Sequence, residues 1–538
     1  MSATGALPPL RWAVAALLVS AALQWLCFMR WPGNPTPDVA YSIFAAQNFL
    51  AHGQLASVNA LSDFGGDLAQ FAKPRWLIQF PPGQSLLYAA AMGLGLSAGA
   101  ATKLLALASL AAGGFGWIVL ARFLGASQKF LFAVAVLYPW LPFVGMAYLL
   151  YTNDHLALAV TPWVALALLQ VEPASLPGGS GPNWRGLLVV AFVALLAVFF
   201  KYSMAPIFIA AGLCLLARDG FRARGLAWST CLVALLVFPA LLSLAVDHAY
   251  RPRIALRVAA PSLPQTLENF LDNSIAATPG WDIVLRGAGP YLARLVHGPL
   301  PQGLLTVISL ALLAVWAIHF RRARLRGRQK SFALFCVTMT GGLWAMLWMT
   351  TYIANSQTDF SAVERYYKPT AMLWLLACGL LLDKMGGRAL LRSAAFYSLA
   401  LPIAVIAMGY VWTGLETPYP AMPGSATAWT QTRDPAHAAF LSKFASAHRP
   451  GLVISAEPWA MTELGVPGIY SQVAILSGIR YWSSTNLEVW MLLKPSERKL
   501  LANIRGAVIA RAPVPPGYPF DFYILRFPGE FGTSVRVP

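Results

Sequence analysis

Apolar runs long enough to cross a lipid bilayer recur along residues 1–412, and they constrain the fold more than any other feature. Of the 538 residues, 58% are hydrophobic and only 11% are charged, whereas about a quarter of an average soluble domain is charged. In hydrocarbon, every backbone N–H and C=O must be bonded internally, so runs of ~20 apolar residues form helices. The sequence therefore predicts an α-helical polytopic membrane protein with about eleven transmembrane helices, among them spans at 130–150, 227–247 and 393–412.

The formal net charge of +18 is distributed in a way that indicates membrane orientation and gives no sign of nucleic-acid binding. Short basic clusters separate successive apolar runs, and such clusters mark cytoplasmic loops. The clusters are Arg218, Arg222 and Arg224; Arg321, Arg322, Arg324, Arg326, Arg328 and Lys330; and Lys384, Arg388 and Arg392.

The first apolar run, 12–30, is preceded by Arg11 and followed by large residues that a signal peptidase does not accept. We therefore expect an uncleaved first span with a cytoplasmic N-terminus, in a bacterial-type inner (cytoplasmic) membrane. The five cysteines lie inside apolar segments, so the sequence shows neither a disulfide framework nor a zinc site.

This orientation places two long loops, 31–83 and 248–300, on the outer face. Residues 84–98 are apolar but short, which is typical of a surface or half-inserted helix. An odd number of spans puts the C-terminus outside. From 413 to 538 the composition becomes that of a soluble domain, and we expect an extracytoplasmic α/β domain there. Its expected elements are helices at 436–448 and 496–504 and strands at 452–455, 507–510 and 520–527.

An acidic residue, Asp38, follows directly on the first span in the sequence Pro37-Asp38-Val39. Apolar residues at 39, 43, 46 and 50 have the spacing of an amphipathic helix, which Gly53 ends. Asp38 then has two interpretations. It caps this helix, with Pro37 at an early helical position, or it performs chemistry where lipid head groups meet water.

Charged residues from distant segments converge on the outer membrane surface, and this convergence favours chemistry. Cations there suit a lipid-linked phosphate, and a carboxylate suits a hydroxyl group. Each residue also has a purely structural interpretation, such as capping a helix, pairing with a neighbour or extending toward head groups. The converging residues are Asp38, Asp154, Lys201, Arg365 and Lys368.

Taken in order, several short motifs resemble the GT-C class of membrane glycosyltransferases, which includes protein mannosyltransferases and the lipid A aminoarabinose transferase. The resemblance covers about residues 10–412. The motifs are Pro37-Asp38-Val39-Ala40-Tyr41, Phe80-Pro81-Pro82-Gly83, Thr152-Asn153-Asp154-His155, Phe200-Lys201-Tyr202-Ser203 and Glu364-Arg365-Tyr366.

The resemblance implies transfer of a sugar from a polyprenyl-phosphate donor to a glycan, lipid or protein acceptor on the outer face, among membrane lipids. Asp38 would be the general base, and Asp154 a second acid that ligates a divalent metal ion in some members. The only cofactor it allows is such a metal ion. The residues expected to bind substrate are His155, Lys201, Arg365, Tyr366 and Lys368.

Two positions depart from the family's patterns. Val39 follows the first-loop acid, so the Asp-Glu pair of protein mannosyltransferases is missing, and Phe80 stands where the aminoarabinose transferases have Lys. Both departures argue against those two specific activities.

Two other functions compete with the glycosyltransferase. A transporter or flippase of a polyprenyl-linked lipid would use the same outer cations for the head group, but the predicted spans carry almost no charge at mid-depth. A structural scaffold would leave the converging charges unexplained.

Overall fold

The computed structural model describes residues 10–29, 37–57, 75–76, 81–141, 144, 154–171, 184–219, 304–323, 325, 327–352, 364–384, 435–448, 451–456, 461, 468–471, 488–502, 508–516, 518 and 520–526. The predicted second outer loop 248–300 and the predicted spans at 227–247 and 393–412 lie outside these residues.

Helices account for nearly all the described residues before the C-terminal region, apart from one short hairpin. They are α1 (Arg11–Met29), α2 (Pro37–His52), α3 (Pro82–Gly93), α4 (Ala98–Phe123), α5 (Gln128–Leu137), α7 (Asp154–Gln170), α8 (Trp184–Phe200), α9 (Pro206–Asp219), α13 (Leu304–Arg322), α14 (Arg328–Tyr352) and α16 (Lys368–Asp383). Short 3-10 turns follow or precede them at η2 (Tyr138–Trp140), η3 (Tyr202–Met204) and η5 (Glu364–Tyr367). Strands β1 (Ala56–Ser57) and β2 (Arg75–Trp76) form the antiparallel hairpin.

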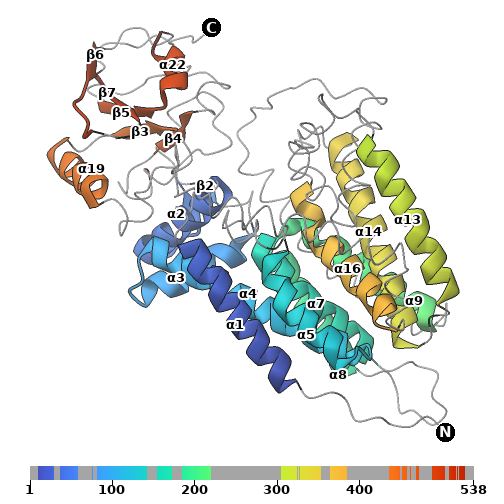
Figure 1. Ribbon diagram of the computed structural model, residues 1–538. Coiled ribbons are helices and arrows are strands. Elements are labelled where there is room, and N and C mark those ends of the chain that lie inside the picture. The colour runs from blue at the N-terminus through green and yellow to red at the C-terminus, as the bar shows by residue number, and fades with distance from the viewer. Residues whose placement is uncertain are drawn as a thin grey trace, which may run out of the picture.

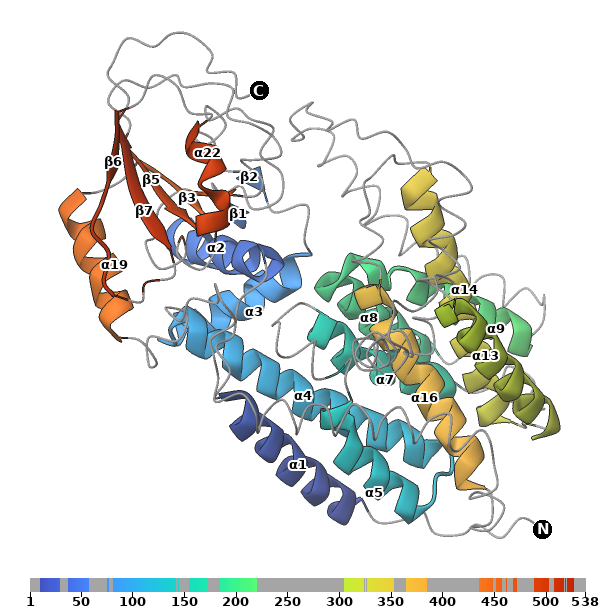
Figure 2. The ribbon, with the colours of Figure 1, turned by 45° about the horizontal axis from the view of Figure 1, so that its top comes forward.

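The helices form two packed groups (Figures 1 and 2). In one, α1, α4, α5, α7 and α8 lie alongside one another, and in the other α14 packs on α9 and α16. Helix α16 also contacts α7, which joins the groups. Helices α2 and α3 pack on each other at one end of α4. Two described helices, α4 and α14, are long and apolar enough to cross a membrane. The expected count of about eleven spans stays a prediction.

Helix α7 is the centre of the helical part, since its residues from Asp154 to Leu169 are buried except Trp163. The backbones of α7 and α4 lie close together. A Cβ on Gly113 would lie 3.0 Å from the Cα of Ala159, and one on Gly116 would lie 2.8 Å from the Cγ of Pro162. Small residues let helices approach closely where the hydrophobic effect does not hold them together.

The run expected to span 130–150 is divided. Helix α5 ends at Leu137, and Tyr138–Trp140 forms a 3-10 turn. Pro139 explains the division, because proline has no N–H to donate and its ring clashes with the preceding turn. Elsewhere the predicted helix at 39–51 is confirmed as α2.

The C-terminal region contains a five-stranded mixed sheet in the order β4-β3-β5-β7-β6. The strands β3, β4 and β5 are parallel to one another, while β7 is antiparallel to both β5 and β6. Their bounds are β3 (Leu452–Ser455), β4 (Gly468–Tyr470), β5 (Glu488–Leu493), β6 (Val508–Arg511) and β7 (Asp521–Arg526).

Helix α19 (Pro435–His448) covers one face of this sheet through aromatic contacts. The ring of Phe444 lies 4.9 Å from that of Trp490 on β5 and 4.5 Å from that of Phe522 on β7, both nearly edge-on. Edge-to-face pairs are the favoured aromatic geometry. The helix expected at 496–504 is shorter: a 3-10 turn, η7 (Pro495–Glu497), and the four-residue α22 (Lys499–Ala502). The extracytoplasmic location of this region stays a prediction.

Candidate functional site

Three charged side chains from three helix ends meet in the helical part. Asp154 is the first residue of α7, Lys201 follows the last residue of α8, and Lys368 is the first residue of α16. Lys201 Nζ forms an ion pair with Asp154 Oδ1, and Lys368 Nζ lies 3.4 Å from Asp154 Oδ2. The two lysines therefore share one carboxylate, each at a different oxygen.

Each member of this ion cluster, Asp154–Lys201–Lys368, is positioned by local sequence. Lys201 has an extended backbone (φ −155°, ψ 118°) between α8 and the 3-10 turn η3, and Pro206 then begins α9. At Lys368, Pro369 occupies an early helical position, and Thr370 Oγ1 donates 2.7 Å to the carbonyl of Tyr367. Proline is preorganised for the first turn of a helix.

The ion cluster is buried and holds two cations and one anion. Asp154 is 1% exposed, Lys201 5% and Lys368 6%. Its three members are one carboxylate and two ammonium groups in a place with little water. Burying a charge is costly unless it is paired.

Helix dipoles add to this potential. The N-terminal ends of α7 and α16 both point at the ion cluster, and each carries a partial positive charge. Asp154 is well placed at such an end, but Lys368 is not, because its charge has the same sign as the dipole. A cation held at a helix N-terminus strengthens a site for an anion.

Aromatic and imidazole groups adjoin the ion cluster. The ammonium of Lys201 lies over the ring of Tyr366, 4.9 Å from its centroid, within the range of cation–π attraction. Tyr367, the residue after Tyr366, is fully buried. His155 directly follows Asp154 on α7 and is 1% exposed. Of the residues expected to bind substrate, the structure thus brings together Lys201, Tyr366 and Lys368.

Asp38 and Arg365 lie in described helices, α2 and η5, but their side chains lie outside the described part of the structure. Asp38 is in the first turn of α2, and Arg365 directly precedes Tyr366. The roles expected for both therefore stay predictions.

The environment of Asp154 does not fit a divalent metal ion. Hard cations take several oxygen ligands, whereas both oxygens of Asp154 face ammonium groups. Within the described ranges, no group of three or more His, Cys, Asp or Glu residues lies close enough to hold a metal.

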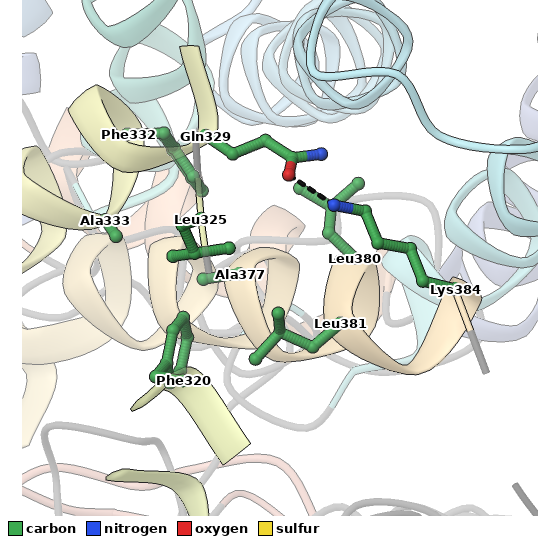
Figure 3. Close-up of a pocket in the computed structure, with 9 residues that line it drawn as sticks. All are labelled: Phe320, Leu325, Gln329, Phe332, Ala333, Ala377, Leu380, Leu381 and Lys384. Atoms are coloured by element: carbon green, nitrogen blue, oxygen red, sulfur yellow. Dashed lines mark hydrogen bonds between the residues drawn. The ribbon is translucent and has the colours of Figure 1, made fainter. Parts of the chain in front are cut away.

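A hollow lies at the Lys384 end of α16 (Figure 3). It is lined by apolar residues of α13, α14 and α16, with Gln329 and Lys384 at its polar edge, where Lys384 Nζ donates to Gln329 Oε1. Lys384 is sixteen residues beyond Lys368, roughly 24 Å along the helix. None of the predicted site residues lines it.

Sequence reasoning missed polar residues at the start of α3. Gln84 and Ser85 are 2% and 0% exposed, and Ser42 of α2 is 1% exposed. Ser42 Oγ donates 3.3 Å to Gln84 Oε1. The sequence signal that could have identified them is the polar pair Gln84 and Ser85, directly after Pro81-Pro82-Gly83 and at the start of an otherwise apolar segment.

Comparison with known proteins supports the GT-C fold. ArnT from Cupriavidus metallidurans in the apo state is 14% identical, over 95% of this chain and 97% of that chain, with a TM-score of 0.51. No protein-family model and no curated protein matches the sequence.

Two further structures are more distant in shape. ArnT from the same organism bound to undecaprenyl phosphate is 14% identical, over 96% of this chain and 98% of that chain, with a TM-score of 0.43. The arabinofuranosyltransferase AftD from Mycobacteria is 15% identical over 97% of this chain, with a TM-score of 0.47, and the chain spans only 42% of its length. At this identity, the likeness to the apo ArnT structure concerns the fold alone.

Proposed function

We propose that this protein is a membrane glycosyltransferase that moves a sugar from a polyprenyl-phosphate donor to an acceptor hydroxyl. The observation that carries the proposal is the buried ion cluster Asp154–Lys201–Lys368, which brings two ammonium groups to one carboxylate. The GT-C fold shared with ArnT supports the same reaction class.

The charge of the donor suits a site with two ammonium groups. A sugar linked to a polyprenyl phosphate is a phosphodiester with one negative charge, which ammonium groups attract. When the bond between the anomeric carbon and the phosphate oxygen breaks, the departing phosphate monoester gains negative charge. The ammonium groups of Lys201 and Lys368 are already in place to stabilise that charge. Arg365, the residue before Tyr366, would add a two-point grip on the same phosphate.

The remaining step is attack by the acceptor. Its hydroxyl oxygen bonds to the anomeric carbon from the face opposite the phosphate, and its proton passes to a carboxylate within hydrogen-bonding reach. Asp38 in the first turn of α2 is the proposed base. The leaving group needs no proton, so a single carboxylate suffices, and in-line attack inverts the anomeric centre.

The proposed location follows from the donor. A long polyprenyl tail stays in the bilayer, so the reaction takes place at the membrane interface. The basic clusters put the ion cluster at the outer face of a bacterial-type inner membrane, with the N-terminus in the cytoplasm and residues 413–538 outside. The acceptor is a glycan, lipid or protein on that face.

The test is consumption of donor by purified protein in nanodiscs. A panel of polyprenyl-phosphate sugars with labelled sugar is offered together with candidate acceptors. Wild-type protein should release polyprenyl phosphate and label an acceptor, and Lys368→Ala should abolish donor binding. The matched control is Lys384→Ala at the other end of α16, which should behave as wild type.

Transport of intact donor across a vesicle membrane without consumption would contradict the proposal and favour the flippase. Equal donor binding by the two lysine variants would show that Lys368 has only a structural role.

A further inference from the structure

The first turn of α3 connects the two parts of the proposed site. Gly83 faces the end of α8: a Cβ added to it would lie 2.6 Å from the carbonyl oxygen of Phe199 and 2.7 Å from the ring of Phe200. Lys201, a member of the ion cluster, is the next residue along the chain. The close approach at Gly83 therefore holds the start of α3 beside the phosphate-binding lysine.

The same turn contacts the helix of the proposed base. Ser42 of α2 donates to Gln84 Oε1 at 3.3 Å. Ser42 lies four residues after Asp38, and residues four apart lie on the same face of a helix. Gln84 thus extends from α3 toward the α2 face that carries Asp38.

Two polar atoms of this turn are buried without a hydrogen-bond partner among the described residues. They are Gln84 Nε2 and Ser85 Oγ, on side chains 2% and 0% exposed. Leaving a buried amide or hydroxyl unsatisfied costs its full desolvation penalty. A protein retains such unsatisfied groups where a bound ligand completes their hydrogen bonds.

We infer that Gln84 and Ser85 form a subsite for hydroxyl groups of the donor sugar, an inference that rests on the proposed function. Both groups are neutral, so they suit hydroxyls and leave the phosphate to the lysines. Gln84 Nε2 donates to a sugar oxygen, while Ser85 Oγ donates or accepts. The subsite lies between the helix of the base and the phosphate lysine, which is where a sugar joined to that phosphate must sit to be attacked.

Neutral donors and acceptors also explain how this subsite would select its substrate. A site built to hydrogen-bond a hydroxyl rejects an analogue that lacks it, because its own buried groups are then left unpaired. The other possible occupant of such a polar site is an ordered water molecule. A water-filled site would be indifferent to the presence of the sugar.

The experiment compares two probes on the same protein in nanodiscs: bare polyprenyl phosphate, and a panel of polyprenyl-phosphate sugars containing a pentofuranose, a hexose and an aminopentose. The variants are Gln84→Leu and Ser85→Ala. We expect their affinity for the best sugar-bearing probe to fall about 10-fold, the equivalent of one lost hydrogen bond. Affinity for bare polyprenyl phosphate should stay within twofold of wild type.

The matched control is Gln128→Leu, which removes another amide with a buried, unpartnered oxygen, Gln128 Oε1, at the far end of the helical part. It should leave both affinities unchanged. Thermal unfolding without ligand gives a second readout. Since Ser85→Ala removes only a buried hydroxyl that has no hydrogen-bond partner among the described residues, its unfolding temperature should equal or exceed that of wild type.

Equal losses for both probes, or no loss for either, would overturn the subsite, as would a large fall in the unfolding temperature of Ser85→Ala. A wild-type protein that binds no polyprenyl phosphate at all would instead reject the proposed function, and the subsite with it.

Discussion

The ammonium group of Lys201 lies 4.9 Å from the ring centroid of Tyr366, and the same ammonium pairs with Asp154. The lysine is thus held from two sides, by a carboxylate and by an aromatic face. A third partner, the donor phosphate, would approach an ammonium group that is already oriented.

The first prediction separates the ring of Tyr366 from its hydroxyl. Tyr366→Phe keeps the aromatic face and should bind the donor nearly as well as wild type. Tyr366→Leu removes that face, and a cation–π contact is worth about 0.5–2 kcal/mol, so donor affinity should fall by roughly 2- to 30-fold. Equal losses in both variants, measured by donor titration, would assign the effect to the hydroxyl.

The second prediction concerns the shared carboxylate. Asp154→Asn removes the carboxylate charge that pairs with both buried ammonium groups, and breaking a buried pair costs about 3–5 kcal/mol. We expect a large drop in unfolding temperature in detergent. Adding Lys368→Met, which removes one of the stranded charges, should restore part of the loss.

The control for that cycle is Asp383→Asn at the other end of α16, where the carboxylate accepts hydrogen bonds from the exposed Ser127. This substitution should lower the free energy of unfolding by about 1 kcal/mol. Additive losses in the Asp154–Lys368 double variant would mean that the two residues do not act as a pair.

The third prediction decides whether Asp38 caps a helix or performs catalysis. Asparagine caps about as well as aspartate, so Asp38→Asn should keep its stability and its donor affinity. If Asp38 accepts the acceptor's proton, turnover should fall by 100-fold or more. Sugar transfer and donor binding are measured on one preparation, and near-normal turnover would leave Asp38 with the capping role alone.

The fourth prediction is a pH dependence in the C-terminal region. A hydrogen bond from Arg498, together with the charges of Arg498 and Arg511, holds the pKa of Asp521 below its ordinary value of 3.8. The folded state therefore binds this proton less tightly than the unfolded chain does. The stabilisation is present above about pH 4 and is lost as the pH falls through the lowered pKa.

Asp521→Asn should accordingly destabilise β7 at neutral pH, by about 1–3 kcal/mol, and the difference from wild type should shrink in acid. Hydrogen exchange of the peptide that contains β7 measures this difference in stability, with the variant and the wild type compared at each pH. A difference that is independent of pH would show that the charge of Asp521 is not what stabilises the strand.

Topology made much of the site predictable from the sequence. Counting spans and reading basic loops put Asp154, Lys201 and Lys368 at one membrane surface, and the structure confirms that these three meet. Counting spans could not predict the ion pairs themselves, because they depend on how α7, α8 and α16 pack. The same holds for Gln84, whose burial is set by the neighbouring α2 and α8.

Local sequence signals predicted several helices and strands correctly. The helix α2 and the strands β3 and β7 were expected from spacing and flanking residues. The strands β4 and β5 were missed. The apolar residues of β5, Val489 to Leu493, form a short continuous run, and periodicity alone does not tell a buried strand from a buried helix. Its pairing with β3 and β7 decides the matter.

The glycine contacts between α4 and α7 have a mechanical consequence. With Gly113 against Ala159 and Gly116 against Pro162, α7 packs closely on α4, and we expect it to hold Asp154 in place. If the proposed donor binds here, its loading and release then require the lysine-bearing ends of α8 and α16 to move around Asp154. A cysteine cross-link between α4 and α7 should leave turnover intact, whereas one between α7 and α16 should stop it.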